Sequence, residues 1–146
     1  MTNTHGNKTV LVDSDALIGL INENDLLHRR CLKISSFLTN NGFTTIVPYS
    51  IVLESATTLA RAQRVNRPDL AHRLLKDYAA SLQPGLKQDR VIKLVAQLYT
   101  PQVSKKNTPF DFYILALAKQ NNISLVFSFD VFYQKQGLTL IEQIID

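Results

Sequence analysis

Two short apolar runs, one near each end of the chain, each lead directly into an aspartate. The run TVLV, residues 9–12, precedes Asp13, and the run ISLVFSF, residues 123–129, precedes Asp130. Short runs this rich in β-branched and aromatic residues predict strands that are buried on both faces, as in a parallel sheet. A carboxylate that follows such a strand is costly to bury unless a partner offsets its charge. The sequence therefore predicts an α/β fold with acids at the ends of its strands.

Helical segments alternate with the predicted strands, and this alternation favours parallel strands covered by helices. Strands are expected at residues 9–13, 43–48, 123–129 and around 138–142. Helices are expected at residues 16–24, 25–42, 49–63, 68–81, 88–99 and 108–122, and a short one is expected after Asp130. The 146 residues suffice for one domain with a substantial core. We expect a single domain over residues 1–146, with residues 1–8 as a flexible segment.

The composition points to a basic, cytoplasmic protein. The net charge is +4 at pH 7, which favours a polyanionic partner such as nucleic acid. A single cysteine, Cys31, excludes an intramolecular disulfide and fits a reducing cytosol. No apolar stretch is long enough to span a bilayer, and the N-terminal residues lack the apolar region of a signal peptide. We therefore expect no membrane association.

Four acids stand where a predicted strand ends or a predicted helix begins. They are Asp13, Glu54, Asp111 and Asp130. Parallel strands bring their carboxyl ends to one edge of the sheet, where α/β proteins bind ligands. Clustered carboxylates repel one another unless a cation lies between them, and Mg²⁺ and Mn²⁺ prefer oxygen ligands. One or two such ions can stabilise the attacking and leaving oxygens of a phosphodiester displacement.

Each acid also has a purely structural alternative. Asp111 forms a capping box with Thr108 and follows Pro109 at the first helical position. Asp13 and Asp130 can each cap the helix that follows. Glu54 can pair with an arginine. The shared context of all four acids favours a common site over four separate structural roles.

Four sequence blocks carry a family resemblance. They are VLVDSDALIGL (10–20), PYSIVLESATTL (48–59), TPFDFYILALAKQNNISLVFSFDVF (108–132) and GLTLIE (137–142). In order and spacing they resemble the PIN-domain nucleases, particularly the toxin subunits of VapBC toxin–antitoxin pairs. The resemblance implies a three-layer α/β/α fold around a parallel sheet and Mg²⁺- or Mn²⁺-dependent endonucleolytic cleavage of RNA by attack of water. It also implies a homodimer and a cognate antitoxin that reaches into the acidic site.

Carried over by position, the resemblance assigns the four acids to a catalytic, metal-binding quartet. Ser14 and Ser128 match small hydroxyl positions that support such a site. Asp15 departs from the pattern, and it either adds a carboxylate to the site or caps a helix. Val131 and Phe132 also depart, because some relatives carry a polar group there, which puts the affinity and choice of metal in doubt.

Basic and aromatic residues offer candidate contacts for RNA. Lys105 and Lys106 precede Asp111 in a polar linker and can reach phosphates or remain solvated. Arg61, Arg64 and Arg67 recur at helical spacing, which favours a solvated helix face over a nucleic-acid groove. Four aromatic residues have apolar neighbours and are expected in the core: Tyr49, Phe110, Phe112 and Tyr113.

Three alternative functions stay open on the sequence alone. The Asp13-x-Asp15 pair after a strand resembles the first motif of haloacid-dehalogenase-type phosphatases, although Ala-Leu follows it and Glu54 is left unexplained. A PIN-like module that binds RNA or a protein without cleavage is a second alternative. A nuclease that matures RNA and is not a toxin is the third.

Overall fold

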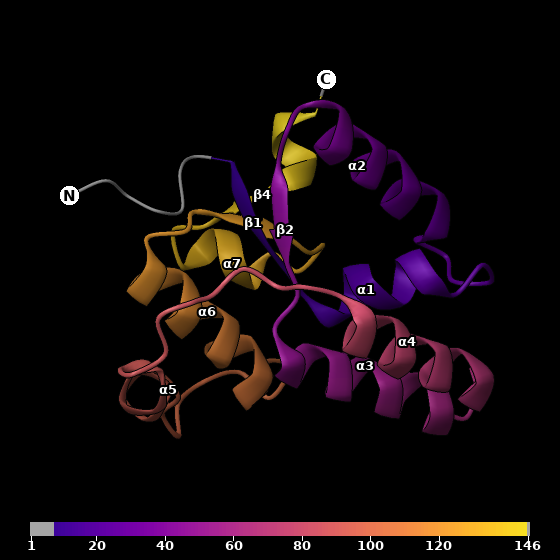
Figure 1. Cartoon of the computed structure of the whole chain (residues 1–146). Helices are drawn as coiled ribbons and strands as arrows, with labels where there is room; N and C mark the ends of the chain where they lie inside the picture. The colour runs from indigo at the N-terminus through magenta and orange to yellow at the C-terminus, as the bar shows by residue number, and fades with distance from the viewer. Residues whose placement is uncertain (1–7, 146) are drawn as a thin grey trace.

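The computed structural model describes residues 8–145, and a parallel sheet runs through the middle of them (Figure 1). Its strands are β1 (Thr9–Val12), β2 (Thr44–Ile46), β3 (Leu125–Phe127) and β4 (Thr139–Leu140). Their order across the sheet is β2-β1-β3-β4, and each strand is parallel to its neighbours. The predicted parallel sheet is confirmed, and the two strands that lead to aspartates are adjacent.

Helices cover the sheet from both sides. They are α1 (Ser14–Ile21), α2 (His28–Asn40), α3 (Tyr49–Arg61), α4 (Pro68–Ala80), α5 (Val91–Leu98), α6 (Pro109–Asn121) and α7 (Phe132–Lys135). In Figure 1, α6 and α7 lie on one side of the strands, and α1 and α2 lie on the other. Helices α3 and α4 pack side by side below α1, and α5 packs against α6. This is the expected three-layer α/β/α arrangement.

The central strand β1 sets the register of the sheet. Val10 and Leu11 are fully buried, and Leu11 lies opposite Ile46 of β2 on one side and Val126 of β3 on the other. The N–H of Asp13 donates to the Phe127 carbonyl at 3.1 Å, so the pairing continues one residue past the strand. The residues that follow β1 and β3 therefore emerge side by side at the same edge of the sheet.

Local polar groups explain where α2 begins and ends. The helix starts at His28 and not at residue 25, because the Asp25 carboxylate accepts a hydrogen bond from the Leu27 N–H at 2.8 Å and closes a turn there. It ends at the expected Asn-Asn-Gly, where Gly42 adopts a φ of 72°. A positive φ costs glycine little, so the chain reverses there into β2.

The C-terminal region differs from its prediction in one respect. Only Thr139 and Leu140 form strand β4, and a 3₁₀ helix, η1 (Ile141–Ile144), follows at once. Residues 1–7 of the predicted flexible segment lie outside the described residues. Lys8 belongs to the described part, where its carbonyl accepts from the Thr44 N–H at 2.8 Å. Within residues 8–145, no helix combines the length and apolarity that a membrane span requires.

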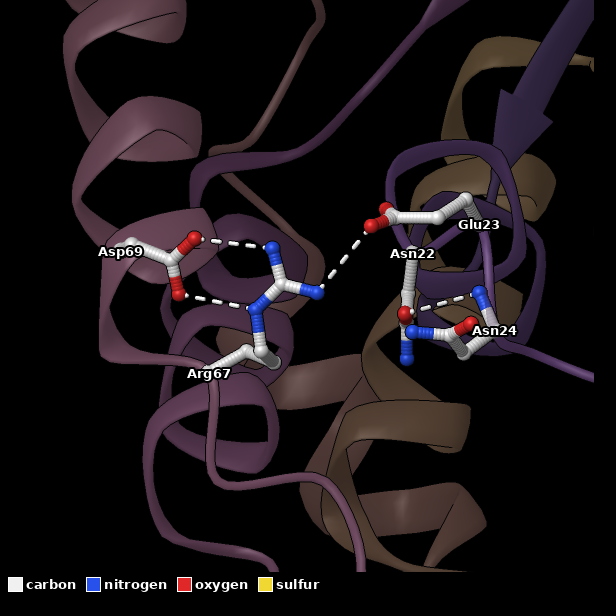
Figure 2. A network of polar contacts seen from close by, with 5 residues as sticks. All are labelled: Asn22, Glu23, Asn24, Arg67 and Asp69. Atoms are coloured by element: carbon white, nitrogen blue, oxygen red, sulfur yellow. Dashed lines mark hydrogen bonds and ion pairs between the residues drawn. The ribbon is translucent and has the colours of Figure 1, made fainter.

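Arg67 links the α3–α4 loop to the loop after α1 (Figure 2). Its guanidinium donates to both carboxylate oxygens of Asp69, at 2.9 and 2.8 Å, and to Glu23 at 3.2 Å. Helix α3 ends at Arg61, so Arg64 and Arg67 lie beyond it. The expected helical face of three arginines is therefore wrong, and Arg67 instead fixes two loops to each other.

Candidate active site

The four predicted acids all lie at the carboxyl edge of the sheet. Asp13 follows β1 and is the N-cap of α1, and Asp130 lies three residues after the end of β3. Glu54 stands in the second turn of α3, the helix after β2, and Asp111 stands in the first turn of α6. Burial raises the pKa values of Asp13, Asp15, Glu54 and Asp111, and the negative charge of at least one neighbouring aspartate raises each of them further, so these acids share one electrostatic environment.

Asp13 lies deepest in this group, with 3% of its surface exposed. Its Oδ1 accepts from the Ser14 N–H and its Oδ2 accepts from the Tyr133 hydroxyl, each at 2.7 Å. Burial and the nearby Asp15 charge raise the pKa of Asp13 to about 8, although both hydrogen bonds lower it. Without a cation, this carboxyl therefore holds its proton near neutral pH.

Asp15 joins α1 to the segment that carries Asp130. Its Oδ2 accepts from the Ser128 hydroxyl at 3.0 Å and from the Phe129 N–H at 2.7 Å, while its Oδ1 accepts from the Ala16 N–H at 2.8 Å. The Ser128 hydroxyl in turn accepts from the Asp130 N–H at 3.1 Å. Asp15 thus accepts one hydrogen bond at the start of α1 and two from the segment after β3, and the latter hold the segment that carries Asp130.

Glu54 is half-buried, and its Oε1 is a buried oxygen without a hydrogen-bond partner. Burial raises its pKa, as do the charges of Asp111 and Asp15, and the Ser14 hydroxyl lowers it. Among residues 8–145, no arginine forms an ion pair with Glu54, so the structural alternative for this residue has no support. A buried carboxylate oxygen without a donor is costly, and a cation would offset that cost.

Asp111 and Asp130 each combine a structural contact with a place at the acidic edge. The Thr108 N–H donates to Asp111 Oδ2 at 2.8 Å, which is the acidic half of the predicted capping box. Burial is the main cause that raises the pKa of Asp111, and the charge of Asp130 adds to it. The Phe132 N–H donates to Asp130 Oδ1 at 2.9 Å at the start of α7. These contacts orient the two carboxylates and leave their charge at the edge.

The donor set suits a hard divalent cation. Among residues 8–145, no three or more His, Cys, Asp or Glu side chains are already placed so that together they could hold a metal ion. The chemistry nonetheless fits, because the acids share one edge, the carboxyl of Asp13 is protonated at neutral pH without a cation, and one Glu54 oxygen lacks a donor. Asp13, Glu54, Asp111 and Asp130 are the residues that could hold such an ion.

The candidate RNA contacts separate into two groups. A groove of about 530 Å³ adjoins Asp130, and Lys106 is among its lining residues, whereas Lys105 is not. Arg61 is exposed at the last position of α3, and Arg64 is exposed beyond it. Neither arginine lines this groove. Of Lys105, Lys106, Arg61 and Arg64, Lys106 is thus the one that shares a groove with an acid, Asp130.

The aromatic residues are only partly buried. Phe112 is in the core, as expected, with 4% of its surface exposed. Tyr49 and Phe110 are exposed to 55% and 38%, so the expectation that they belong to the core is wrong. Both stand in the first turn of a helix, Tyr49 in α3 and Phe110 in α6. Tyr113 is half-buried, and its hydroxyl donates to Gln88 at 3.3 Å.

Tyr133 is the site residue that the sequence reasoning missed. It is fully buried, and its hydroxyl is the side-chain donor to Asp13. Burial raises its pKa, and the negative charge of Asp13 raises it further, so the phenol stays protonated. Its place one turn after Asp130, in a short helix that follows a strand, was the available signal. A buried tyrosine usually directs its hydroxyl to a polar partner.

Comparisons with known proteins agree with this geometry. The family model of the PIN domain matches residues 10–135. Among solved structures, the sarcin–ricin loop cleaving toxin VapC20 of Mycobacterium tuberculosis is similar, with a TM-score of 0.72 and 13% sequence identity. The similarity covers 89% of this chain and 96% of that chain, which confirms the fold. No curated protein sequence gives a significant match to this chain.

Proposed function

This chain belongs to the PIN-domain family, and we propose that it is a metal-dependent endoribonuclease that acts in the cytoplasm as the toxin of a toxin–antitoxin pair. The observation that carries the proposal is the environment of Asp13. This carboxyl is buried at the carboxyl edge of the sheet, and burial and neighbouring charge raise its pKa to about 8. A carboxyl in this state is suited to exchange its proton for a divalent cation.

In this proposal, Asp13, Glu54, Asp111 and Asp130 hold one or two Mg²⁺ or Mn²⁺ ions. A bound ion supplies a Lewis acid that lowers the pKa of water and neutralises charge on the phosphate. Three further groups of the chain position the acids. The Tyr133 hydroxyl orients Asp13, and the contact between Asp15 and Ser128 holds the segment that carries Asp130.

The proposed reaction is the hydrolysis of one phosphodiester bond in RNA. The oxygen of a water molecule forms a bond to phosphorus, one P–O bond to a ribose oxygen breaks, and a proton passes to that oxygen. The products are one fragment with a terminal phosphate and one with a hydroxyl. The acidic edge would hold the cation at the reacting phosphate, while the positive net charge of +4 favours association with the polyanion.

Two observations support the toxin role over a general nuclease role. The similar structure of VapC20 is that of a toxin described as cleaving the sarcin–ricin loop. The similarity also extends over 89% of this chain and 96% of that chain, so it involves the whole PIN fold and not one motif. We accordingly propose a cognate antitoxin that blocks the acidic edge, and a homodimer as the assembled form. RNA maturation is the alternative role for the same chemistry.

The first experiment is cleavage of a panel of structured RNAs by the wild type and by Asp130→Asn, each with Mg²⁺, Mn²⁺ or EDTA. The asparagine can keep the hydrogen bond from the Phe132 N–H through its amide oxygen, so the variant should fold. We expect metal-dependent cleavage by the wild type and a loss of about 100-fold or more in the variant. Cleavage by both proteins in EDTA would contradict the proposal.

A binding module without cleavage is the second candidate, and RNA-binding measurements and Mn²⁺ calorimetry on the wild type, made beside the cleavage panel, separate it. That alternative predicts that RNA binding persists in EDTA, that no panel member is cut, and that calorimetry detects no binding of Mn²⁺. The phosphatase alternative is disfavoured by the family match and by the contacts of Asp15. Three donors already hold that carboxylate on the segment after β3 and at the start of α1.

A further inference from the structure

The groove beside Asp130 lies between the linker that precedes α6 and the short helix α7. Its polar lining includes Lys106 and Asn107 from the linker and Lys135 and Gln136 from the other side. The two cations come from segments about 30 residues apart in sequence and face one hollow. Asp130 is the only acid among the lining residues that the structure describes. The groove is therefore positively charged up to the point where it meets the proposed site.

Both lysines extend from backbone that is held in place. The Lys106 N–H donates to the Ser104 hydroxyl at 3.3 Å, and the next N–H, that of Asn107, donates to the Ser104 carbonyl at 3.0 Å. The Lys135 N–H donates to the Val131 carbonyl at 3.2 Å within α7. Neither side chain forms an ion pair within residues 8–145. Both ammonium groups are thus available to a ligand.

The remaining lining is apolar and suits unpaired bases. Leu98, Val103 and Val131 are among the lining residues, and Val131 is 54% exposed. Phe112 and Phe132 form part of the wall, with their rings in an edge-to-face contact. Single-stranded nucleic acid combines a charged backbone with apolar base faces, and proteins that bind it pair cations with such surfaces. A volume of about 530 Å³ matches a ligand of one or two nucleotides.

We propose that this groove binds the single-stranded RNA that adjoins the reacting phosphate, with Lys106 and Lys135 each contacting a backbone phosphate. The inference rests on the proposed function, and it adds the path of the substrate on one side of the acids. It also assigns an RNA contact to Lys106 and not to the neighbouring Lys105, because Lys105 does not line the groove.

A second basic hollow serves as an internal comparison. It has a similar volume of about 550 Å³ and is lined by Lys87, Arg90 and Lys119, among others. Lys119 lies in the last turn of α6, whereas Asp111 lies in the first, so the hollow is about 12 Å away along the helix. Its acid, Asp89, accepts a hydrogen bond from Gln120. This hollow is basic but remote from the acids, so its lysines provide matched controls for charge.

The experiment compares Lys106→Ala/Lys135→Ala with Lys87→Ala/Lys119→Ala, which removes the same charge from exposed lysines of the second hollow. Binding of a labelled, mixed-sequence single-stranded RNA is measured in EDTA over a range of KCl concentrations. We expect the groove variant to bind about tenfold more weakly and to lose about 1.4 from the slope of log K against log salt, since each phosphate contact on a single strand contributes roughly 0.7. The control variant should behave as the wild type.

Cleavage kinetics on any RNA that the wild type cuts provide the second readout. We expect a raised KM with kcat within about twofold, because the contacts bind substrate and transition state alike. Equal slopes and equal KM values for the two double variants would overturn the groove, as would a wild type that binds no single-stranded RNA. A wild type that cuts nothing would count against the proposed function alone, because the binding experiment still decides the groove.

Discussion

At the scale of single residues, Asp13 shows that a buried carboxylate charge in this site is energetically costly. The buried carboxyl has a pKa of about 8, against an ordinary value of 3.8. The unfolded chain therefore releases this proton at a much lower pH than the folded chain does. The stability associated with the neutral carboxyl is fully present below about pH 4, and it is lost as the pH rises through about 8.

The first prediction concerns Asp13→Asn. We expect that the free energy of unfolding of the wild type in EDTA falls between pH 5 and pH 8, and that the variant shows a shallower fall. At pH 8 the variant should be more stable by roughly 1–3 kcal/mol, since each unit of pKa shift corresponds to about 1.4 kcal/mol. Asparagine can accept from the Ser14 N–H, and the Tyr133 hydroxyl can rotate to accept from its amide.

Urea unfolding at the two pH values measures the effect. The variant should keep a residual slope, because burial also raises the pKa values of Asp15, Glu54 and Asp111. Equal slopes for the wild type and the variant would show that Asp13 does not titrate in this range.

The second prediction concerns Tyr133→Phe. Loss of the hydroxyl leaves Asp13 Oδ2 without its donor and should destabilise the protein by about 1–3 kcal/mol. The hydrogen bond from Tyr133 lowers the pKa of Asp13, so its removal should raise that pKa and move the pH profile of cleavage to higher pH. At pH 7, kcat/KM should fall by about 10- to 100-fold, as for other groups that orient metal ligands.

Tyr113→Phe is the matched control for this prediction. It removes a tyrosine hydroxyl from the same chain, but that hydroxyl donates to Gln88 at an exposed position. Its pH profile should coincide with that of the wild type. If Tyr133→Phe also kept the wild-type profile, the hydroxyl would have a packing role only.

At the scale of elements, the start of α6 serves two purposes with one side chain. Asp111 accepts from the Thr108 N–H and so satisfies a backbone donor at the helix start, and its charge lies at the acidic edge. The structural and the functional interpretations of this residue therefore do not compete. A cap fixes the rotamer of the carboxylate, and a fixed carboxylate is a better ligand for a metal.

The third prediction separates these two purposes by substitution. Asp111→Asn can keep the cap through its amide oxygen, so its free energy of unfolding should lie within about 0.5 kcal/mol of the wild type. Asp111→Ala loses the cap and should be about 1 kcal/mol less stable. Cleavage should fall by about 100-fold or more in both variants, because both lose the charge. Thermal unfolding and cleavage assays measure the two effects, and full activity of Asp111→Asn would remove Asp111 from the site.

The elements also show how far the sequence alone could lead. Local signals placed the strands, most helix boundaries and the edge where the acids lie, because burial, capping and turn residues act over a few positions. The contact between Asp15 and Ser128 spans 113 positions, and the contact between Tyr133 and Asp13 spans 120. No local pattern encodes such pairs. The same limit applies to Arg67, whose helical spacing was misleading because α3 ends at Arg61.

At the scale of the whole molecule, the acids should couple metal binding to stability. Burial and the charges of neighbouring carboxylates raise the pKa values of Asp13, Glu54 and Asp111, so a cation that binds only the folded protein should stabilise it. The fourth prediction is that Mn²⁺ at about 100 times its Kd adds about 2.7 kcal/mol and raises the midpoint of thermal unfolding by roughly 5–10 °C.

Calorimetric scans with MnCl₂, with EDTA and with NaCl at matched ionic strength measure this shift. The Asp130→Asn variant should respond less than the wild type, because it has lost one charge of the acidic edge. An equal shift in both proteins would place the ion elsewhere on the molecule.

The strand order has a consequence for the synthesis of this protein. Strand β1 lies between β2 and β3, and Asp13 depends on Tyr133, which lies near the other end of the chain. A ribosome releases the chain from its N-terminus, so Asp13 and Glu54 emerge long before β3 and α7 are made. An unfinished chain thus lacks the strand beside β1 and the hydroxyl that orients Asp13. If the finished protein cleaves RNA, that activity has to wait until β3 and α7 have been made and have folded against β1.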